Sequence, residues 1–162
     1  VSRLNMDLRE SKGWSYGVRS QVRMVKETIP FLLFAPVQVD RTGDSAKALI
    51  GNMKTFLTSS GVTGEELQRT INNQVFSLPG SFETSSDLLG AIARNATYGR
   101  PDDYYVKLAG RYRAMKATDL DTAARQSLRP DDLIWVVVGD PAKVEPQLKP
   151  LGLPVEVRKA GE

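Results

Sequence analysis

The chain has 162 residues, of which 41% are hydrophobic and 25% charged, and its formal net charge is +3. This is the composition of an ordinary globular protein of about one domain. The sequence contains no histidine and no cysteine, which excludes the usual zinc sites, disulfides, thiol nucleophiles and histidine-containing catalytic triads. No apolar run reaches the length of a membrane span. Basic residues are spread among acidic ones with no block of like charge, which favours a mixed solvated surface over a nucleic-acid interface.

The first predicted elements are a helix, a glycine stop and a strand. Leu4 and Leu8 share one helical stripe, and Gly13 is suited to the left-handed conformation that ends a helix. The turn is expected to bring the guanidinium of Arg9 and the phenol of Tyr16 toward the same end of a sheet. Both groups donate hydrogen bonds and together are able to grip a carbonyl or an oxyanion. The residues expected on the packed face of the strand are Tyr16, Val18, Ser20, Val22 and Met24.

A second strand is predicted over Ile29–Val39, and the two strands should form an antiparallel hairpin. Pro30 and Pro36 cannot donate to a ladder, so each must face an edge, a bulge or a gap in the pairing. One face of this strand is expected to carry Phe31, Leu33, Ala35, Val37 and Val39. Leu32 and Phe34 lie on the opposite face, which suggests that this face is partly covered or forms a surface for a neighbouring domain.

Helical periodicity fills most of the middle of the chain. The clearest amphipathic helix is capped by Asp44 and runs to Leu57, and it should lie across the hairpin. Thr63 and Glu66 have the spacing of a capping box. The other predicted helices are one with Phe82 to Ala96 on a stripe and Gly99 as its stop, one with Pro101 at its first position, and a short one capped by Thr118.

The apolar run Leu133–Gly139 predicts a central strand that is buried on both faces, with Trp135 in the core. Asp140 and Pro141 begin another helix, and Val155–Val157 is a final strand. The order of elements predicts an α+β fold, in which an antiparallel or mixed β-sheet carries helices largely on one face. Residues 1–162 are expected to form a single domain.

The stretch around Arg9 and Tyr16 resembles one protein family. An arginine is followed seven residues later by a tyrosine, in a Leu-Arg and Lys-Gly-x-x-Tyr context after a Ser-Arg-Leu helix. This pattern is similar to the pitrilysin/insulinase-type zinc metallopeptidases, which include mitochondrial processing peptidase and related bacterial zinc proteases. In that family, zinc sits in one domain on a His-x-x-Glu-His helix. A second domain of the same fold supplies the arginine and the tyrosine, and Arg9 and Tyr16 match those two positions.

The resemblance implies a C-terminal portion of the non-zinc domain of a longer metallopeptidase. Arg9 and Tyr16 would then contact the substrate carbonyl in the transition state, and zinc is expected in the partner domain and not in this chain. The implied partners are a zinc-bearing homologous domain or subunit and a peptide substrate. The implied compartment is periplasmic or secreted.

Two alternatives stay open at this point. The same family contains core subunits that keep the fold without proteolysis, so the chain is also consistent with a non-catalytic interaction subunit. The pair itself also has a structural interpretation, in which Arg9 compensates a helix dipole and Tyr16 packs its ring.

Overall fold

The computed structural model describes residues 2–25 and 28–159, and these residues form two compact units. The first unit contains residues 2–23, 30–58 and 128–159. The second unit contains residues 24, 25, 28, 29 and 59–127. A two-stranded antiparallel sheet together with several helices confirms the α+β fold class. Among the described residues, no helix is both long and apolar enough to cross a membrane.

The first unit begins with two short helical pieces. Ser2 caps α1 (Arg3–Asn5) by accepting a hydrogen bond from the backbone of Asn5, and a π-helical turn, η1 (Met6–Ser11), follows directly. Leu8 in this turn is completely buried. The helical part of the chain then ends before Gly13, whose φ of 62° is the left-handed conformation that favours glycine. The predicted helix and its glycine stop are therefore confirmed.

The hairpin is shorter than the sequence predicts. β1 (Arg19–Val22) pairs antiparallel with β2 (Phe31–Phe34), and Arg19 lies opposite Phe34. All four residues of β1 are exposed, so the expected packed face from Tyr16 to Met24 is wrong except at Val18, which is buried. The ladder ends after the pair Arg19–Phe34, because Pro36 further along has no N–H to donate. An isolated bridge between Ser15 and Val37 resumes it further along.

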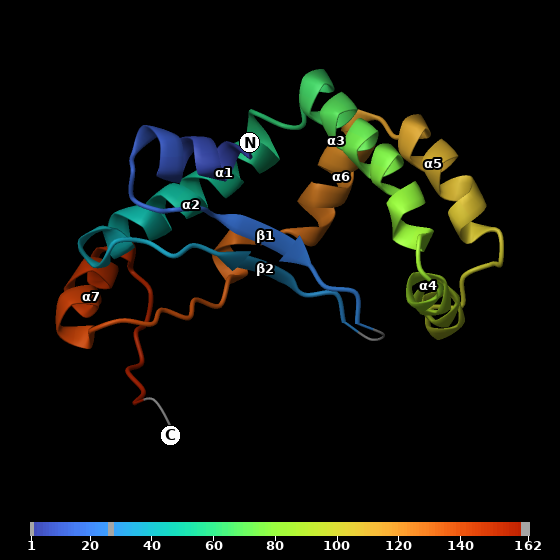
Figure 1. Cartoon of the computed structure of the whole chain (residues 1–162). Helices are drawn as coiled ribbons and strands as arrows, with labels where there is room; N and C mark the ends of the chain where they lie inside the picture. Colours follow the sequence, from blue (N-terminus) through green and yellow to red (C-terminus); the bar gives the residue numbers. More distant parts are fainter. Residues whose placement is uncertain (1, 26–27, 160–162) are drawn as a thin grey trace. The chain divides into compact units, whose positions relative to one another are not determined.

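The longest helix of the first unit, α2 (Thr42–Thr58), lies along the hairpin on the same side as α1 (Figure 1). It begins two residues before the predicted cap, directly after the 3-10 turn Val39–Arg41, and Asp44 lies inside the helix, where it contacts Arg41. Its buried residues include Ala46, Leu49 and Met53. The core of this unit consists of Leu8, Val18 and Leu49, with these half-buried residues around them: Leu4, Leu33, Ala35, Val37, Ala48 and Trp135.

The segment Leu133–Gly139 differs most from its prediction. It is extended, but it belongs to no strand, and most of its side chains are exposed. Ile134, Val136 and Val138 are 92%, 82% and 95% exposed, whereas Trp135 is half-buried against the core. The predicted central strand and the burial of Trp135 are therefore wrong. The apolar composition is present, but no neighbouring strand covers it in the described part of the chain.

The C-terminal part of the first unit begins with α7 (Pro141–Leu148). Asp140 caps this helix through a 3.0 Å hydrogen bond from the Ala142 backbone, as predicted. Val155–Val157 forms no ladder, so the predicted last strand is wrong. Short 3-10 turns complete both units: Val39–Arg41, Pro79–Phe82, Pro130–Asp132 and Lys149–Leu151.

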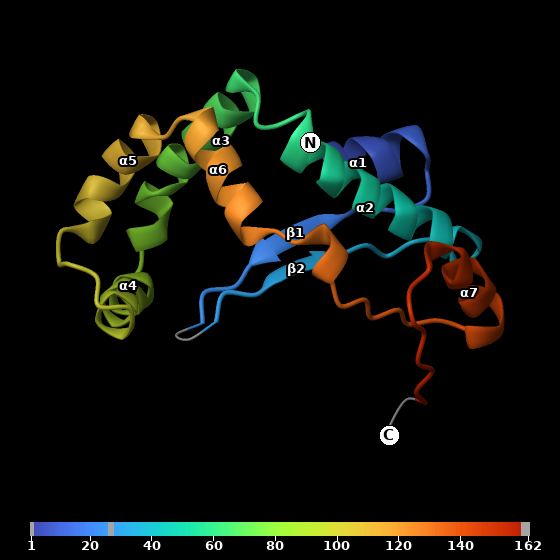
Figure 2. The same cartoon turned by 180° about the vertical axis from the view of Figure 1, so that it is seen from behind.

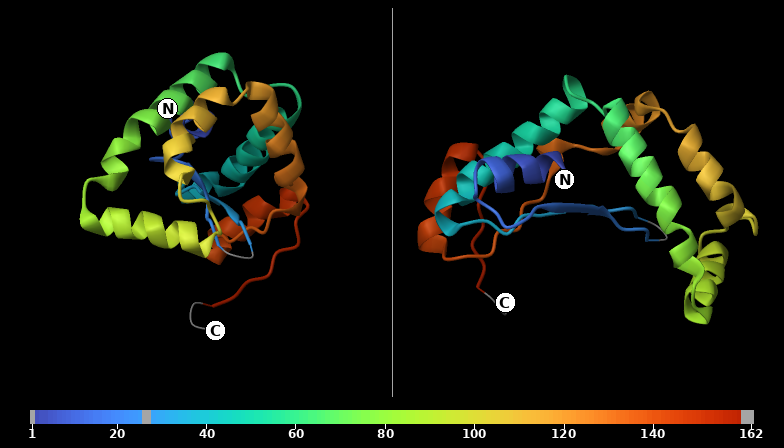
Figure 3. Two further views of the ribbon diagram at one scale, coloured as in Figure 1. Left: turned by 90° about the vertical axis from the view of Figure 1, so that its right-hand side faces the viewer. Right: turned by 45° about the horizontal axis from the view of Figure 1, so that its top comes forward.

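Four helices make up most of the second unit (Figure 2). Two predictions here are wrong in detail, because Pro101 lies before the fifth helix and Thr118 lies inside the sixth. The third helix packs against the fifth, and Figure 3 shows the fourth helix at one end of this unit. The bounds are α3 (Gly64–Ser77), α4 (Ser85–Thr97), α5 (Tyr104–Ala114) and α6 (Ala117–Ser127).

Candidate functional site

Arg9 projects from the π-helical turn η1. This turn widens the backbone hydrogen bonding to a span of five residues, as in the 3.1 Å bond from the Lys12 amide to the Asp7 carbonyl. Turns of this kind are rare and often lie at functional sites. The Arg9 side chain is 56% exposed, and its Nε lies 3.4 Å from the carboxylate of the adjacent Glu10. An exposed ion pair of this sort is weak, so the guanidinium remains able to bind another acceptor.

Tyr16 lies at the bend before β1 and is 97% exposed. In the described part of the chain its hydroxyl makes no hydrogen bond. The residue before it is fixed, because buried Ser15 donates to the Pro36 carbonyl at 2.7 Å and accepts from the Gly17 amide at 3.1 Å. The phenol therefore stands in solvent on a well-held backbone. The alternative in which Tyr16 packs its ring is wrong.

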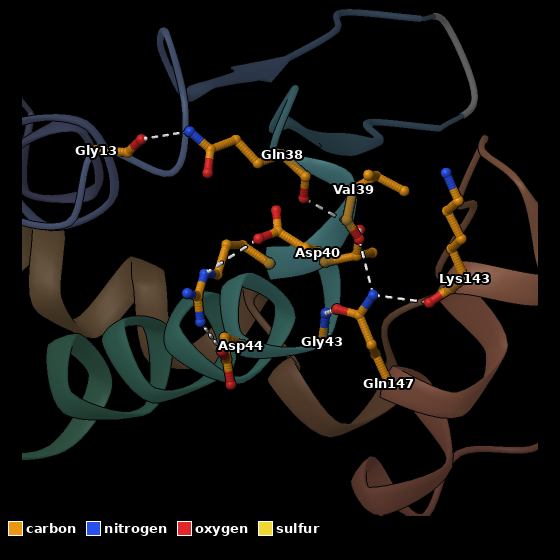
Figure 4. Close-up of polar contacts among 10 residues, drawn as sticks. Gly13, Gln38, Val39, Asp40, Gly43, Asp44, Lys143 and Gln147 are labelled. Carbon is orange, nitrogen blue, oxygen red and sulfur yellow. Dashed lines mark hydrogen bonds and ion pairs between the residues drawn. The ribbon is translucent and has the colours of Figure 1, made fainter.

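The turn between the two residues is closed by backbone hydrogen bonds. The Gly13 amide donates to the Arg9 carbonyl at 3.1 Å, and the Trp14 amide donates to the Leu8 carbonyl at 2.9 Å. Gln38 holds the turn from the other side, because its side-chain amide donates to the Gly13 carbonyl at 3.1 Å (Figure 4). The Gln38 backbone amide also donates to the Trp14 carbonyl at 2.9 Å.

A side chain of α1 completes this framework. The Asn5 amide group donates to the Val18 carbonyl and accepts from the Val18 amide, and both hydrogen bonds measure 2.7 Å. Neither Asn5 nor Ser15 was identified by the sequence analysis as part of the site. The only local signal was the spacing from Ser2 to Asn5, which is that of a helix cap. The framework thus holds Arg9 and Tyr16 from both ends of the turn.

The electrostatics near the turn centre on Asp7. Burial alone would raise the pKa of Asp7, but hydrogen bonds from Lys12 and Asn52, together with the charge of Lys12, lower it below its usual value of 3.8. The Asn52 amide lies 2.7 Å from the Asp7 carboxylate and so links η1 to α2. Asp7 is therefore ionised at neutral pH and serves the fold of the turn.

The arrangement supplies two exposed hydrogen-bond donors on one short, braced segment. No hydrogen bond or ion pair joins Arg9 to Tyr16 among the contacts of the described residues. Arg9 is also the basic residue in the last turn of η1, which fits the helix-dipole interpretation. The pair is thus open to an outside acceptor, and its role in catalysis stays a prediction.

A resident zinc does not fit this chain. It has no histidine or cysteine, and within residues 2–25 and 28–159 no three acidic side chains gather where they could hold a metal ion. Zinc sites in enzymes need imidazole or thiolate ligands, alone or with a carboxylate. The donors here are a guanidinium and a phenol, which suit an anionic or carbonyl oxygen instead.

The chain is similar to a known protein in its structure, whereas the comparisons of its sequence found no match. No family model matches the chain, and no curated protein matches it. A solved structure described as a peptidase M16 inactive domain, from Pseudomonas fluorescens, is similar with a TM-score of 0.73 and 21% sequence identity. The match covers 80% of this chain and 31% of that one, so the chain corresponds to about a third of its neighbour. Peptidase M16 is the family name of the pitrilysin/insulinase-type peptidases, so the neighbour supports the resemblance at the level of the fold.

Proposed function

We propose that this chain is the metal-free, substrate-contacting part of an M16-type metallopeptidase. In this proposal, Arg9 and Tyr16 donate hydrogen bonds to a peptide carbonyl in an active site whose zinc is held by another domain. The fold of the M16 neighbour and the spacing of the two residues support it. The partner would be a zinc-bearing homologous domain or subunit, and the substrate a peptide.

The observation that carries the proposal is the exposure of Tyr16. A tyrosine that contributes to a core buries its ring, whereas this one leaves 97% of its surface in water while Ser15 and Val18 on either side are buried. Its backbone is held by hydrogen bonds that involve Ser15 and Gly17. A phenol that is fixed at its base and free at its hydroxyl is suited to reach an acceptor outside the chain.

The two groups differ in what they offer to a carbonyl oxygen. Arg9 presents a guanidinium, a planar fork of N–H donors, whereas Tyr16 donates a single O–H. Negative charge builds up on the carbonyl oxygen as the peptide bond is attacked, so donors that are already in place stabilise that state more than the ground state. Asp7 and Asn52 link η1 to α2 through a 2.7 Å hydrogen bond and so hold the turn in place.

The experiment begins with the coding sequence next to this chain, which is read for His-x-x-Glu-His. A polypeptide that carries the motif is co-purified with the chain, and kcat and KM are measured on fluorescence-quenched casein. Arg9→Ala and Tyr16→Phe should each lower kcat on the order of a hundredfold, with a smaller effect on KM and unchanged melting of the chain.

Matched controls are available within the chain. Arg23→Ala removes another exposed arginine, and Tyr112→Phe removes another tyrosine hydroxyl; both variants should keep the parental kcat. Unchanged kinetics in both Arg9→Ala and Tyr16→Phe would reject the role of the pair. A fall in melting temperature with an unchanged rate per folded molecule would instead assign the pair to the fold.

A second candidate function is a non-catalytic interaction domain of the same fold. The description of the M16 neighbour as an inactive domain favours it. On this alternative the chain still binds its zinc-bearing partner, but Tyr16→Phe leaves turnover unchanged. The same kinetic series therefore separates the two candidates.

A further inference from the structure

The loop that joins α4 to α5 is the yellow segment of Figures 1 and 2, and it belongs to the second unit. Its first residues end α4 in a Schellman arrangement, because Gly99 has a φ of 59° and its amide donates to the Ala96 carbonyl at 3.4 Å. The Arg100 amide donates to the Asn95 carbonyl at 2.9 Å. Pro101 follows and disfavours helical backbone for the residue before it. The backbone of Arg100 is therefore fixed on both sides.

The guanidinium group of Arg100 lies over two aromatic rings. Its central carbon is 4.4 Å from the centroid of the Tyr104 ring and 5.1 Å from that of the Tyr98 ring. An apolar residue that packs on the last helical turn is common at this position of a Schellman motif. An arginine that stacks on rings keeps such a contact and adds a charge. The local fold thus presents a cation at a defined place.

The two rings are themselves held by further contacts. The Tyr98 hydroxyl donates to the Met24 carbonyl at 2.9 Å. The Tyr104 ring meets the Tyr105 ring edge to face at a centroid distance of 5.1 Å, and Tyr105 meets Phe82 in the same way at 5.1 Å. Aromatic pairs of this geometry are favourable beyond the area that they bury. The guanidinium therefore rests on an ordered platform, and a ligand need not pay the whole cost of ordering it.

A second guanidinium group shares this platform. Arg111 lies two helical turns after Tyr104 on the same face of α5, and its guanidinium carbon is 5.5 Å from the centroid of the Tyr104 ring. Two cations that contact one ring lie close together, and their mutual repulsion is relieved when an anion binds between or beside them. We call Tyr98, Arg100, Tyr104 and Arg111 the arginine–tyrosine cluster.

The cluster contains no acid of its own. Within residues 2–25 and 28–159, neither Arg100 nor Arg111 makes an ion pair or a side-chain hydrogen bond. Asp103 is already paired with Lys107, and the exposed Asp102 forms no ion pair with a described residue. The donor groups of both arginines are therefore open to a carboxylate from outside the chain.

We propose that the arginine–tyrosine cluster binds an acidic segment of a partner polypeptide, whose neighbouring carboxylates pair with Arg100 and Arg111. A guanidinium stacks through its face and donates hydrogen bonds through its edge, so the rings leave its fork free to pair with both oxygens of a carboxylate. The inference goes beyond the proposed peptidase role. It concerns the second unit and uses neither Arg9 nor Tyr16.

The charges around the cluster favour an acidic polypeptide over a nucleic acid. A nucleic acid needs a row of cations that follows its phosphates. Asp102 and Asp103 lie in the same loop as Arg100 and would oppose such a continuous row of negative charge, and the net charge of the chain is only +3. A flexible peptide is able to place its carboxylates on the two arginines and turn away from the aspartates.

The first test measures the fluorescence anisotropy of a labelled peptide that contains a run of glutamates, titrated with the whole chain. The control peptide has glutamine in place of each glutamate. We expect submillimolar binding of the glutamate peptide at low ionic strength, weaker binding as salt is added, and no binding of the glutamine peptide. Failure of the glutamate peptide to bind would overturn the proposal.

Charge-neutralising variants locate the site. Arg100→Gln and Arg111→Gln should each weaken peptide binding about tenfold, because each removes a charge-assisted pair. Arg113→Gln removes the same charge from the last turn of α5, but the helical period places Arg113 on the opposite face from Tyr104. It should change affinity less than about twofold. Equal effects of the three substitutions would mean attraction to the net charge alone and would reject the cluster.

Two further variants test the platform and the local charge. Tyr104→Phe keeps the ring and should keep the parental affinity, whereas Tyr104→Leu removes it and should weaken binding about threefold. Asp102→Asn removes a competing negative charge and should raise the affinity about twofold. A gain of this kind does not arise from misfolding. Equal binding by the two Tyr104 variants, or weaker binding by Asp102→Asn, would contradict the proposed contacts.

Two other outcomes would also overturn the proposal. A single-stranded oligonucleotide of the same charge that binds more tightly than the peptide, and loses affinity in Arg100→Gln and Arg111→Gln, would assign the cluster to phosphates. Lower melting temperatures for these two variants with peptide affinity unchanged per folded molecule would assign the arginines to the fold, where Arg111 also suits the end of the helix dipole.

Discussion

The side chain of Asn5 pairs with the backbone of Val18 as a neighbouring strand would, since it donates to the carbonyl and accepts from the amide at 2.7 Å each. Val18 is buried beside Leu8 and Leu49, so loss of these bonds would leave two largely buried backbone groups without a partner. One asparagine therefore joins the start of the chain to the start of the hairpin and fixes the turn that carries Arg9 and Tyr16.

Removal of this pairing should destabilise the first unit. Asn5→Ala leaves both backbone groups of Val18 unpaired and is expected to lower the free energy of unfolding by about 1–3 kcal/mol. Urea denaturation followed by tryptophan fluorescence measures it. Asn72→Ala, on the exposed face of α3, is the control and should change stability by less than about 0.5 kcal/mol. Equal effects of the two substitutions would contradict the importance of the pairing.

Trp135 should contribute less than a fully buried tryptophan. It is half-buried against the core and lies between the exposed residues Ile134 and Val136. Trp135→Ala is therefore expected to cost about 1–3 kcal/mol, below the roughly 3–5 kcal/mol of a fully buried large-to-small change. Val136→Ala, at an 82% exposed position, should be nearly neutral in the same denaturant melts. A loss above about 4 kcal/mol for Trp135→Ala would mean that the segment is covered on both faces after all.

Asp7 makes the stability of the first unit depend on pH. Its pKa is lowered in the fold by Lys12 and Asn52, so the ionised carboxylate stabilises the folded chain above its usual value of 3.8. This contribution should be lost as the pH falls below 3.8 through the lowered pKa. Asp7→Asn should therefore be less stable than the parent at neutral pH, and the difference should shrink in acid. A difference that stays constant with pH would show that the carboxylate charge contributes nothing.

Two glycines of α2 should respond to alanine in opposite directions. A Cβ at Gly43 would overlap the Gln147 carbonyl oxygen. The Gln147 side chain already joins α7 to α2 there, because it accepts a 3.2 Å hydrogen bond from the Gly43 amide (Figure 4). Gly43→Ala should therefore cost about 1–3 kcal/mol. Gly51 has open space around it, so Gly51→Ala should stabilise the helix by up to about 1 kcal/mol. Thermal melts of both variants measure these effects. Stabilisation by both substitutions would mean that helix propensity alone decides the result and that the contact with Gln147 does not matter.

Two of the local capping signals in the sequence predicted the structure correctly. The capping box at Thr63 is present, with the Glu66 amide 3.2 Å from the threonine hydroxyl and the Glu66 carboxylate 3.0 Å from the Thr63 amide. Asp140 caps α7 in the same short-range way. These contacts join residues two or three positions apart, so the spacing in the sequence contains the whole interaction.

Contacts over longer separations could not be read in this way. Asn5 meets Val18 across 13 residues, and Ser15 meets Pro36 across 21. The fate of Leu133–Gly139 depended on whether a strand lies on each side of it, and six apolar residues cannot specify that. The exposure of Arg9 and Tyr16 agrees with their predicted role, which itself stays a prediction, as does the single domain 1–162.

The π-helical turn Met6–Ser11 gives the seven-residue interval from Arg9 to Tyr16 a physical meaning. A π-helical turn contains one residue more than an α-helical turn, and each residue advances an α-helix by about 100°. Deletion of Glu10 would let the turn relax to α-helical bonding while it shortened the interval and rotated the guanidinium relative to the bend at Tyr16. The seven-residue spacing of the pair thus includes the extra residue of the π-helical turn, and an insertion or deletion there would change how the two donors are placed relative to each other even if both side chains were kept.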